Sequence, residues 1–170
     1  MEVAKRAYER VMEWIAATSS VQVQTNSFFI DRGTTWEPPP QGWLKCNFDS
    51  SFHSDSEHSG LGWIVRWDHK GAYIDSDFAH IEGIHSSLQA EASAFLQALQ
   101  MVWVKGWRNV WFEGDCLPLV NIVNMKKENI ELASLLEDVR YWMSKLPNCS
   151  LGFINRERNS AADKIAKYAY

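Results

Sequence analysis

Hydrophobic and polar residues alternate over residues 44–49, which predicts a strand with one apolar face and with Asp49 on the other face. Two further strands are predicted at Gly60–Trp67 and Ala72–Ile81. Between them lies Asp68–Gly71, a segment of four residues of the kind found in turns. The second and third strands are therefore expected to form an antiparallel hairpin.

After residue 85 the apolar residues recur at helical spacing, and the helix predicted there begins with Ser86 and Gln89 in the arrangement of a capping box. A hairpin followed by strand–helix–strand crossovers predicts an α/β fold, with helices on both faces of a five-stranded mixed sheet. In this sheet the fourth and fifth strands run parallel to the first. The further elements expected are helices at 88–103, 117–123, 132–146 and 160–168, and strands at 110–113 and 151–154.

The first 42 residues differ in pattern from the rest of the chain. Apolar residues at helical spacing predict a short amphipathic helix over residues 3–17. Three consecutive prolines, Pro38–Pro40, impose an extended, stiff segment. We therefore expect residues 1–42 to form an N-terminal helix with a proline-rich leader, and residues 43–170 to form one compact domain.

Composition narrows the classes of protein. The 170 residues are 46% hydrophobic, enough to bury a core, and no apolar run approaches the roughly 20 residues of a membrane span. A net charge of −4 argues against a protein that coats nucleic acid. Three widely spaced cysteines indicate neither a disulfide framework nor a zinc site, and the N-terminus has no secretory pattern. We expect an intracellular protein, in nucleus or cytoplasm.

Four acidic residues lie at or near the ends of predicted elements: Asp49, Glu91, Asp115 and Asp163. Each has an ordinary explanation. Asp49 suits a strand-terminating turn, and Asp115 suits the N-cap of the following helix. Glu91 suits a solvated helix flank, and Asp163 suits the first turn of a helix. If the first and fourth strands are adjacent and parallel, however, the four carboxylates can converge, and such a cluster persists where Mg²⁺ or a similar cation binds.

Five segments of the chain carry a family pattern: Asn47–Ser51, Gly60–Arg66, Leu88–Glu91, Phe112–Asp115 and Arg156–Asp163. In this order, over about residues 43–170, they resemble the successive motifs of type 1 ribonuclease H. The most similar form is the reverse-transcriptase-like domain that is abundant in plants and related to non-LTR retroelements. The resemblance implies a ribonuclease H-like fold and an endoribonuclease that hydrolyses the RNA strand of RNA–DNA hybrids.

The resemblance also implies a cofactor and its ligands, two Mg²⁺ ions that Mn²⁺ could replace. By position, Asp49 would bind both ions, and Glu91 and Asp115 would complete the site of one of them. Asp163 would complete the site of the other. All four residues would then be catalytic as well as metal-binding.

The resemblance to type 1 ribonuclease H also implies which residues contact nucleic acid. Ser50, Ser51, Gln89 and Asn159 are candidates for contacts to the 2′-hydroxyls that distinguish RNA from DNA. Arg156 would contact a phosphate, although an exposed, solvated charge is an equally ordinary interpretation.

Two departures from the family pattern affect the expected substrate binding and the expected assistance to product release, respectively. Many members have a basic helical protrusion, whereas here Lys126 and Lys127 are followed by acidic residues at 128, 131, 137 and 138. Many bacterial members have a histidine just before the fourth carboxylate, where this chain has Arg156–Arg158. The five histidines lie elsewhere, and we expect them on the solvated surface.

We therefore expect a monomer that binds RNA–DNA hybrid weakly and in a salt-sensitive manner, and that does not bind membranes. Two alternatives stay open. One is a catalytically weak or inactive, retroelement-derived module that binds nucleic acid or serves as a scaffold. The other is a nuclease of the same fold with a different substrate, such as a 3′ exonuclease.

Overall fold

The computed structural model describes residues 37–56, 58–67 and 71–170. The helix expected at residues 3–17 lies outside the described residues, as does most of the expected turn between the second and third strands. The described elements are β1 Leu44–Phe52, β2 His58–Trp67, β3 Ala72–Glu82, α2 Ser87–Val104, β4 Asn109–Gly114, α3 Leu117–Asn124, α4 Ala133–Lys145, β5 Asn148–Phe153, a 3-10 turn at Arg156–Arg158 and α5 Ser160–Ala169.

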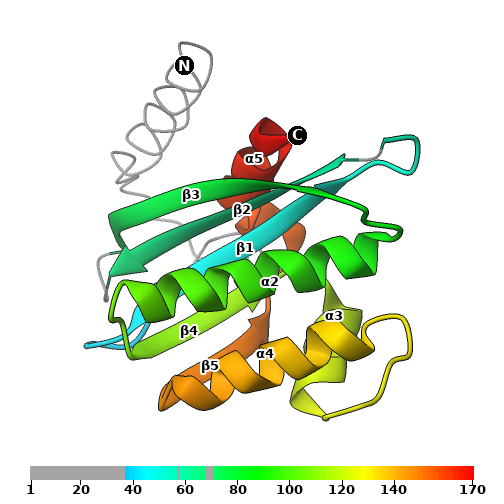
Figure 1. Ribbon diagram of the computed structural model, residues 1–170. Helices are drawn as coiled ribbons and strands as arrows, with labels where there is room; N and C mark the ends of the chain where they lie inside the picture. Colours follow the sequence, from blue (N-terminus) through cyan, green and yellow to red (C-terminus); the bar gives the residue numbers. More distant parts are fainter. Residues whose placement is uncertain (1–36, 57, 68–70) are drawn as a thin grey trace, which may run out of the picture.

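The five strands form one mixed sheet in the order β3-β2-β1-β4-β5. β2 is antiparallel to both β1 and β3, whereas β4 is parallel to both β1 and β5. Helices α2, α3 and α4 pack on one face of the sheet and α5 on the other (Figure 1). The predicted α/β class, the mixed sheet and the helices on both faces are confirmed.

The main core lies between the sheet and helices α2–α4. At its centre the ring of Phe95, on α2, is 5.0 Å from that of Phe48 on β1 and 5.4 Å from that of Phe112 on β4, measured between centroids. All three side chains are fully buried. Burial of aromatic surface in this way is a large source of stability, and here it joins two strands far apart in sequence to one helix.

Strand ends differ from the prediction. β2 begins at His58 rather than Gly60, and β5 begins at Asn148 rather than Leu151. The added residues are mostly polar, so apolar alternation does not reveal them. They belong to the strands because their backbones pair with neighbours: His58 with Glu82 of β3, and Asn148 with Asn109 of β4.

The described end of the proline-rich leader lies against the domain. Pro39 is buried, and the Nζ of Lys45 donates a hydrogen bond to the carbonyl oxygen of Glu37 at 2.6 Å. The domain boundary at residue 43 stays a prediction. None of the helices in the described part of the chain is long and apolar enough to span a membrane.

The contact between β2 and α5 depends on glycine. A Cβ atom at Gly62 would lie 2.9 Å from the carbonyl oxygen of Ala162 and closer still to the backbone nitrogen of Ala166. Both obstacles are backbone atoms, which cannot rotate away. The helix therefore approaches the strand more closely than any side chain would permit.

We predict that Gly62→Ala destabilises the protein by about 1–3 kcal/mol, the usual cost of overpacking. The matched control is Gly152→Ala in β5, where the new Cβ would lie 2.8 Å from Nε1 of the Trp111 side chain, which can move. Urea unfolding of both variants measures the difference. A Gly62→Ala variant as stable as Gly152→Ala would contradict the close packing of α5.

Candidate metal centre

Parallel pairing of β1 with β4 brings Asp49 and Asp115 to the same end of the sheet. Asn47 pairs with Glu113 in this ladder, and the two aspartates follow these residues by two positions on each chain segment. Residues two apart on a strand share a face, and parallel strands end at the same edge. Asp49 lies within β1, and Asp115 directly follows β4.

Glu91 joins these two residues from helix α2. One carboxylate oxygen each from Asp49, Glu91 and Asp115 lie within 4.8 Å of one another. Two hydrogen bonds from Ser50 hold the group: its backbone nitrogen donates to Oδ1 of Asp49 at 2.8 Å, and its hydroxyl donates to Oε1 of Glu91 at 2.6 Å. The structure thus brings together three of the four acidic residues singled out in the sequence.

Burial and mutual repulsion disfavour the charged forms of this group. Burial, followed by the charge of Asp115, raises the pKa of Asp49 to about 7. Burial and the charge of Asp49 raise the pKa of Glu91 well above its ordinary value. The pKa of Asp115 is also raised, mainly by burial, although the nearby guanidinium of Arg156 acts in the opposite direction.

Two carboxylate oxygens of the group have no hydrogen-bond partner among the described residues: Oδ2 of Asp49 and Oε2 of Glu91, both buried. A buried polar atom without a partner costs free energy. A divalent cation would satisfy both oxygens and relieve the repulsion. Mg²⁺ and similar hard cations take oxygen ligands and retain water, so the residues present fit such an ion.

Asp163 lies in the first turn of α5, outside the group of three, and makes two ion pairs of its own. Its Oδ2 is 2.7 Å from the Nζ of Lys167, and its Oδ1 is 3.4 Å from a guanidinium nitrogen of Arg156. Its charge still contributes to the raised pKa values of Asp49 and Asp115. Arg156, a candidate for phosphate contact, is exposed and is held here by a carboxylate.

Three of the other candidates for nucleic-acid contact have structural roles. Ser50 orients the carboxylates, as described above. Oε1 of Gln89 accepts from the backbone nitrogen of His85 at 2.9 Å, and the backbone nitrogen of Gln89 donates to the Ser86 hydroxyl at 3.1 Å, so Ser86 and Gln89 cap α2 as predicted. The buried Asn159 donates from Nδ2 to the carbonyl oxygen of Phe48 at 2.9 Å and thereby ties α5 to β1. Ser51 is buried in β1.

Three of the ordinary explanations for the acidic residues are wrong. Asp49 does not belong to a turn that ends the strand, because β1 continues to Phe52. The N-cap of α3 is Cys116, without a side-chain hydrogen bond, so Asp115 does not cap that helix. Glu91 is only 8% exposed, so it is not a solvated flank residue. Asp115 and Glu91 lie instead where strand and helix ends meet.

Sequence reasoning missed a buried ion pair next to the centre. Lys45 is 1% exposed, its Nζ lies 2.8 Å from Oε1 of Glu113, and it sits over the ring of Trp111 at 4.1 Å from the centroid. Alternation placed Lys45 on the same face of the strand as Asp49. It gave no sign that this face is buried as well.

Comparison with known proteins decides the family. The model of the reverse transcriptase-like family matches residues 47–169. The chain belongs to this family. A search of curated protein sequences gives no significant match.

Solved structures similar to this reverse transcriptase-like domain include several ribonucleases H. Ribonuclease H1 from the halophilic archaeon Halobacterium salinarum NRC-1 is 19% identical, with a TM-score of 0.69 over 75% of this chain and 97% of that one. The N-terminal ribonuclease H domain of Rv2228c from Mycobacterium tuberculosis is 18% identical, with a TM-score of 0.67 over 75% and 92%. LC11 ribonuclease H1, solved in complex with RNA/DNA hybrid, is 20% identical, with a TM-score of 0.67 over 74% and 95%. At this identity the likeness shows the ribonuclease H fold.

The raised pKa of Asp49 predicts how the stability of the metal-free domain depends on pH. Between about pH 4, where Asp ionises in the unfolded chain, and about pH 7, the folded state binds more protons, so stability falls as pH rises. Asp49→Asn removes this charge and retains an oxygen that can accept from Ser50. In EDTA we expect the free energy of unfolding of the variant to exceed that of wild type by roughly 1–3 kcal/mol at pH 7.5. Near pH 4.5 the two values should be similar.

Thermal and urea unfolding at the two pH values measure this difference. Asp138→Asn, the same change at an exposed position of α4, is the control and should follow wild type at both. A loss of stability in Asp49→Asn that is equal at both pH values would show instead that Asp49 has only a structural role in β1.

Proposed function

We propose that this protein is a metal-dependent endoribonuclease that hydrolyses the RNA strand of RNA–DNA hybrids with two Mg²⁺ ions. The observation that carries the proposal is the convergence of Asp49, Glu91 and Asp115 with two buried carboxylate oxygens left without partners. Membership of the reverse transcriptase-like family and the likeness to ribonucleases H, one of them solved with RNA/DNA hybrid, support it.

In this proposal the four carboxylates divide between the two ions. Asp49 would be the shared ligand, with Glu91 and Asp115 completing one site. Asp163 would complete the other, and to do so it would exchange its ion pairs with Lys167 and Arg156 for the ion. When bound, the ions supply an activated water and stabilise the leaving 3′ oxygen.

The chain's own residues orient the ligands and contact the hybrid. Ser50 holds Asp49 and Glu91 in place through its two hydrogen bonds. Polar groups around the centre, namely those of Ser50, Ser51, Gln89 and Asn159, would recognise 2′-hydroxyls of the RNA strand. Arg156, once it leaves Asp163, would contact a phosphate.

Cleavage of labelled substrates tests the proposal. We expect cleavage of RNA–DNA hybrid with Mg²⁺ or Mn²⁺, none in EDTA, and none of duplex DNA. Asp49→Asn should lower the rate by at least about a hundredfold, more than the usual loss of a group that only orients a ligand. Asp138→Asn should cleave like wild type. Cleavage that survives EDTA or the Asp49→Asn change would overturn the two-metal proposal.

One observation favours a weak or inactive, nucleic-acid-binding or scaffold module as the second candidate. Both carboxylate oxygens of Asp163 are engaged by basic side chains, so the fourth ligand is neutralised without a metal. Lys167→Ala distinguishes the candidates. If the ion pair suppresses activity, the variant should cleave hybrid faster than wild type at limiting Mg²⁺, whereas a scaffold shows no cleavage in either form.

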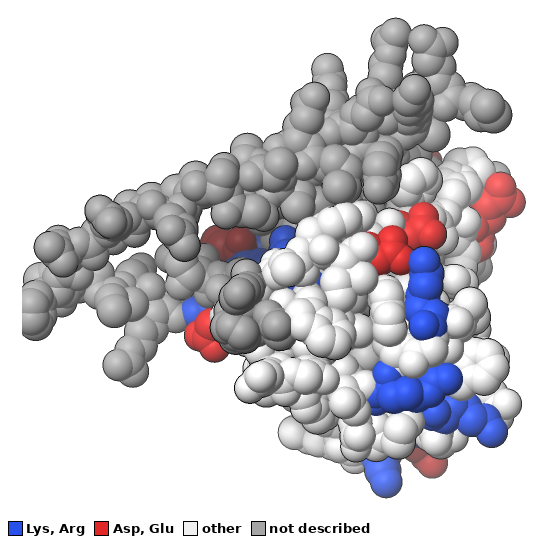
Figure 2. Space-filling view, turned by 90° about the vertical axis from the view of Figure 1, so that its left-hand side faces the viewer, with Lys and Arg blue, Asp and Glu red and all other residues white. Residues whose placement is uncertain are grey.

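The distribution of charge predicts weak binding of hybrid. The net charge is −4, and residues 125–132 join α3 to α4 without a helix. The face in Figure 2, at the end of the sheet away from Asp115, has small groups of basic and acidic side chains among uncharged ones. With about three phosphates neutralised, raising salt from 50 to 200 mM should weaken binding roughly 40-fold.

Fluorescence anisotropy in EDTA over a salt series measures this dependence. Arg156→Ala should reduce the slope of log affinity against log salt by about one. Arg108→Ala is the control, since Arg108 precedes β4 at the end of the sheet opposite Asp115. Tight binding that is insensitive to salt would contradict the prediction.

A further inference from the structure

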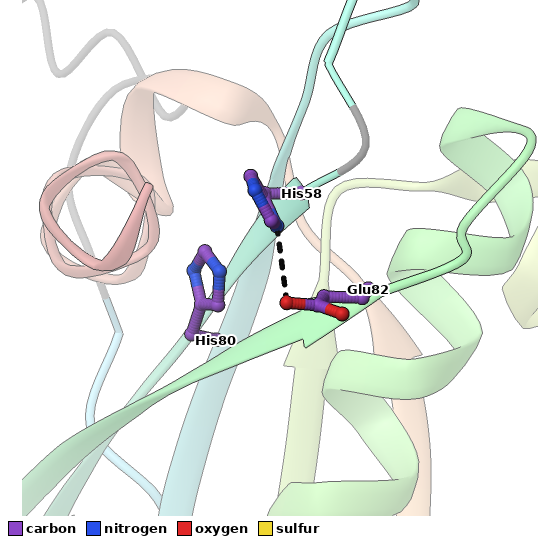
Figure 3. Close-up of side chains that lie close together, drawn as sticks. All are labelled: His58, His80 and Glu82. Atoms are coloured by element: carbon purple, nitrogen blue, oxygen red, sulfur yellow. Dashed lines mark ion pairs between the residues drawn. The ribbon is translucent and has the colours of Figure 1, made fainter.

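Two histidines and a glutamate form a second group of metal-ligating side chains, at the outer edge of the sheet. His58 lies directly opposite Glu82 in the β2–β3 ladder, and His80 precedes Glu82 by two residues. In an antiparallel pair this register places all three side chains on one face. Figure 3 shows them pointing toward one another from the two strands. One ligand atom from each lie within 4.8 Å of one another.

The spacing in this group suits a metal ion better than a simple ion pair. Nδ1 of His58 is 3.6 Å from Oε1 of Glu82, beyond hydrogen-bond distance. Ligands on a tetrahedral ion with bonds near 2.05 Å are separated by about 3.4 Å, so the observed gap is close to that required. Nδ1 of His58 is also hidden from solvent and has no hydrogen-bond partner among the described residues.

His80 is oriented by the end of helix α5. Its Nδ1 is 3.2 Å from the carbonyl oxygen of Ala169, the last residue of that helix. With a proton on Nδ1 donated to this carbonyl, the lone pair of the ring is on Nε2, where a metal can bind it. Histidine ligands of metals are commonly held by such a bond from their other nitrogen. The carboxyl end of a helix also carries partial negative charge, which favours a nearby cation.

We propose that His58, His80 and Glu82 bind one divalent transition-metal ion of the Zn²⁺ type, with water completing the coordination. Two imidazoles and one carboxylate select zinc, nickel or copper rather than magnesium. His80 and Glu82 are exposed, so an ion can reach the site. The site has no residue in common with the acidic group of Asp49, and it connects β2 to β3 beside the end of α5. A bound ion should therefore stabilise the fold.

Binding of ZnCl₂ to the full-length, EDTA-treated protein tests this inference. Equilibrium dialysis in millimolar Mg²⁺, added to occupy the proposed magnesium site, should give one Zn²⁺ per chain, and Zn²⁺ should raise the midpoint of thermal unfolding. His80→Gln should weaken binding about tenfold or more and abolish the thermal shift. The control is His85→Gln, which changes an exposed histidine just beyond β3 and should bind like wild type.

Two further variants make the result unambiguous. Asp49→Asn should retain the Zn²⁺ site, and its loss there would place the ion in the acidic centre and overturn the inference. Glu82→Gln removes the third ligand without touching either histidine, and it replaces His80→Gln if that variant does not fold. Unchanged Zn²⁺ affinity in the folded ligand variant would mean that the three residues form only a surface ion pair. Because hybrid cleavage is not measured, failure here leaves the proposed nuclease function untouched.

Discussion

The parallel pairing of β1 with β4 is the constraint on which the acidic centre depends, and a buried ion pair holds that pairing in register. Lys45 contacts Glu113 across the two strands, and Asn47 donates from Nδ2 to the other oxygen of Glu113 at 3.2 Å. A slip of one residue in either strand would turn these polar side chains into the apolar core beneath α2. An unpaired buried charge costs several kcal/mol. The register that sets Asp49 beside Asp115 is therefore enforced a few residues earlier.

Buried carboxylates at Glu113 and at the acidic centre are in opposite electrostatic situations: one is paired with a cation and the others are not. Glu113 is neutralised within the protein, by Lys45 and Asn47. Two residues further along, Asp115 joins Asp49 and Glu91, where oxygens are left without partners and burial raises the pKa values. Unrelieved electrostatic cost of this kind is concentrated at functional sites. Charge pairing at Glu113 fixes the framework, and the acidic group keeps uncompensated charge that a divalent cation would relieve.

Residue patterns in the sequence predict the element order and the sheet because alternation and helical spacing report which residues face the main core. These patterns do not predict strand ends that depend on backbone pairing, or burial that depends on a side-chain partner from another strand. The ends of β2 and β5 depend on ladder partners rather than on apolar residues. Burial of Lys45 depends on Glu113 arriving from another strand. The ion pair between Asp163 and Lys167 can be predicted from the sequence, since residues four apart on a helix are neighbours. The grouping of His58 with His80 required the β2–β3 register.

Helix α5 connects the two candidate cation sites, with Asp163 in its first turn and the carbonyl of Ala169 beside His80 at its end. Communication between the sites would need an element with two alternative positions. α5 has little freedom of this kind, because its backbone rests on Gly60 and Gly62 of β2 without intervening side chains. A helix seated in this way can hold a ligand at each end and still transmit little from one to the other. The close packing that fixes α5 therefore argues that ions would bind independently at the acidic centre and at the group of His58, His80 and Glu82.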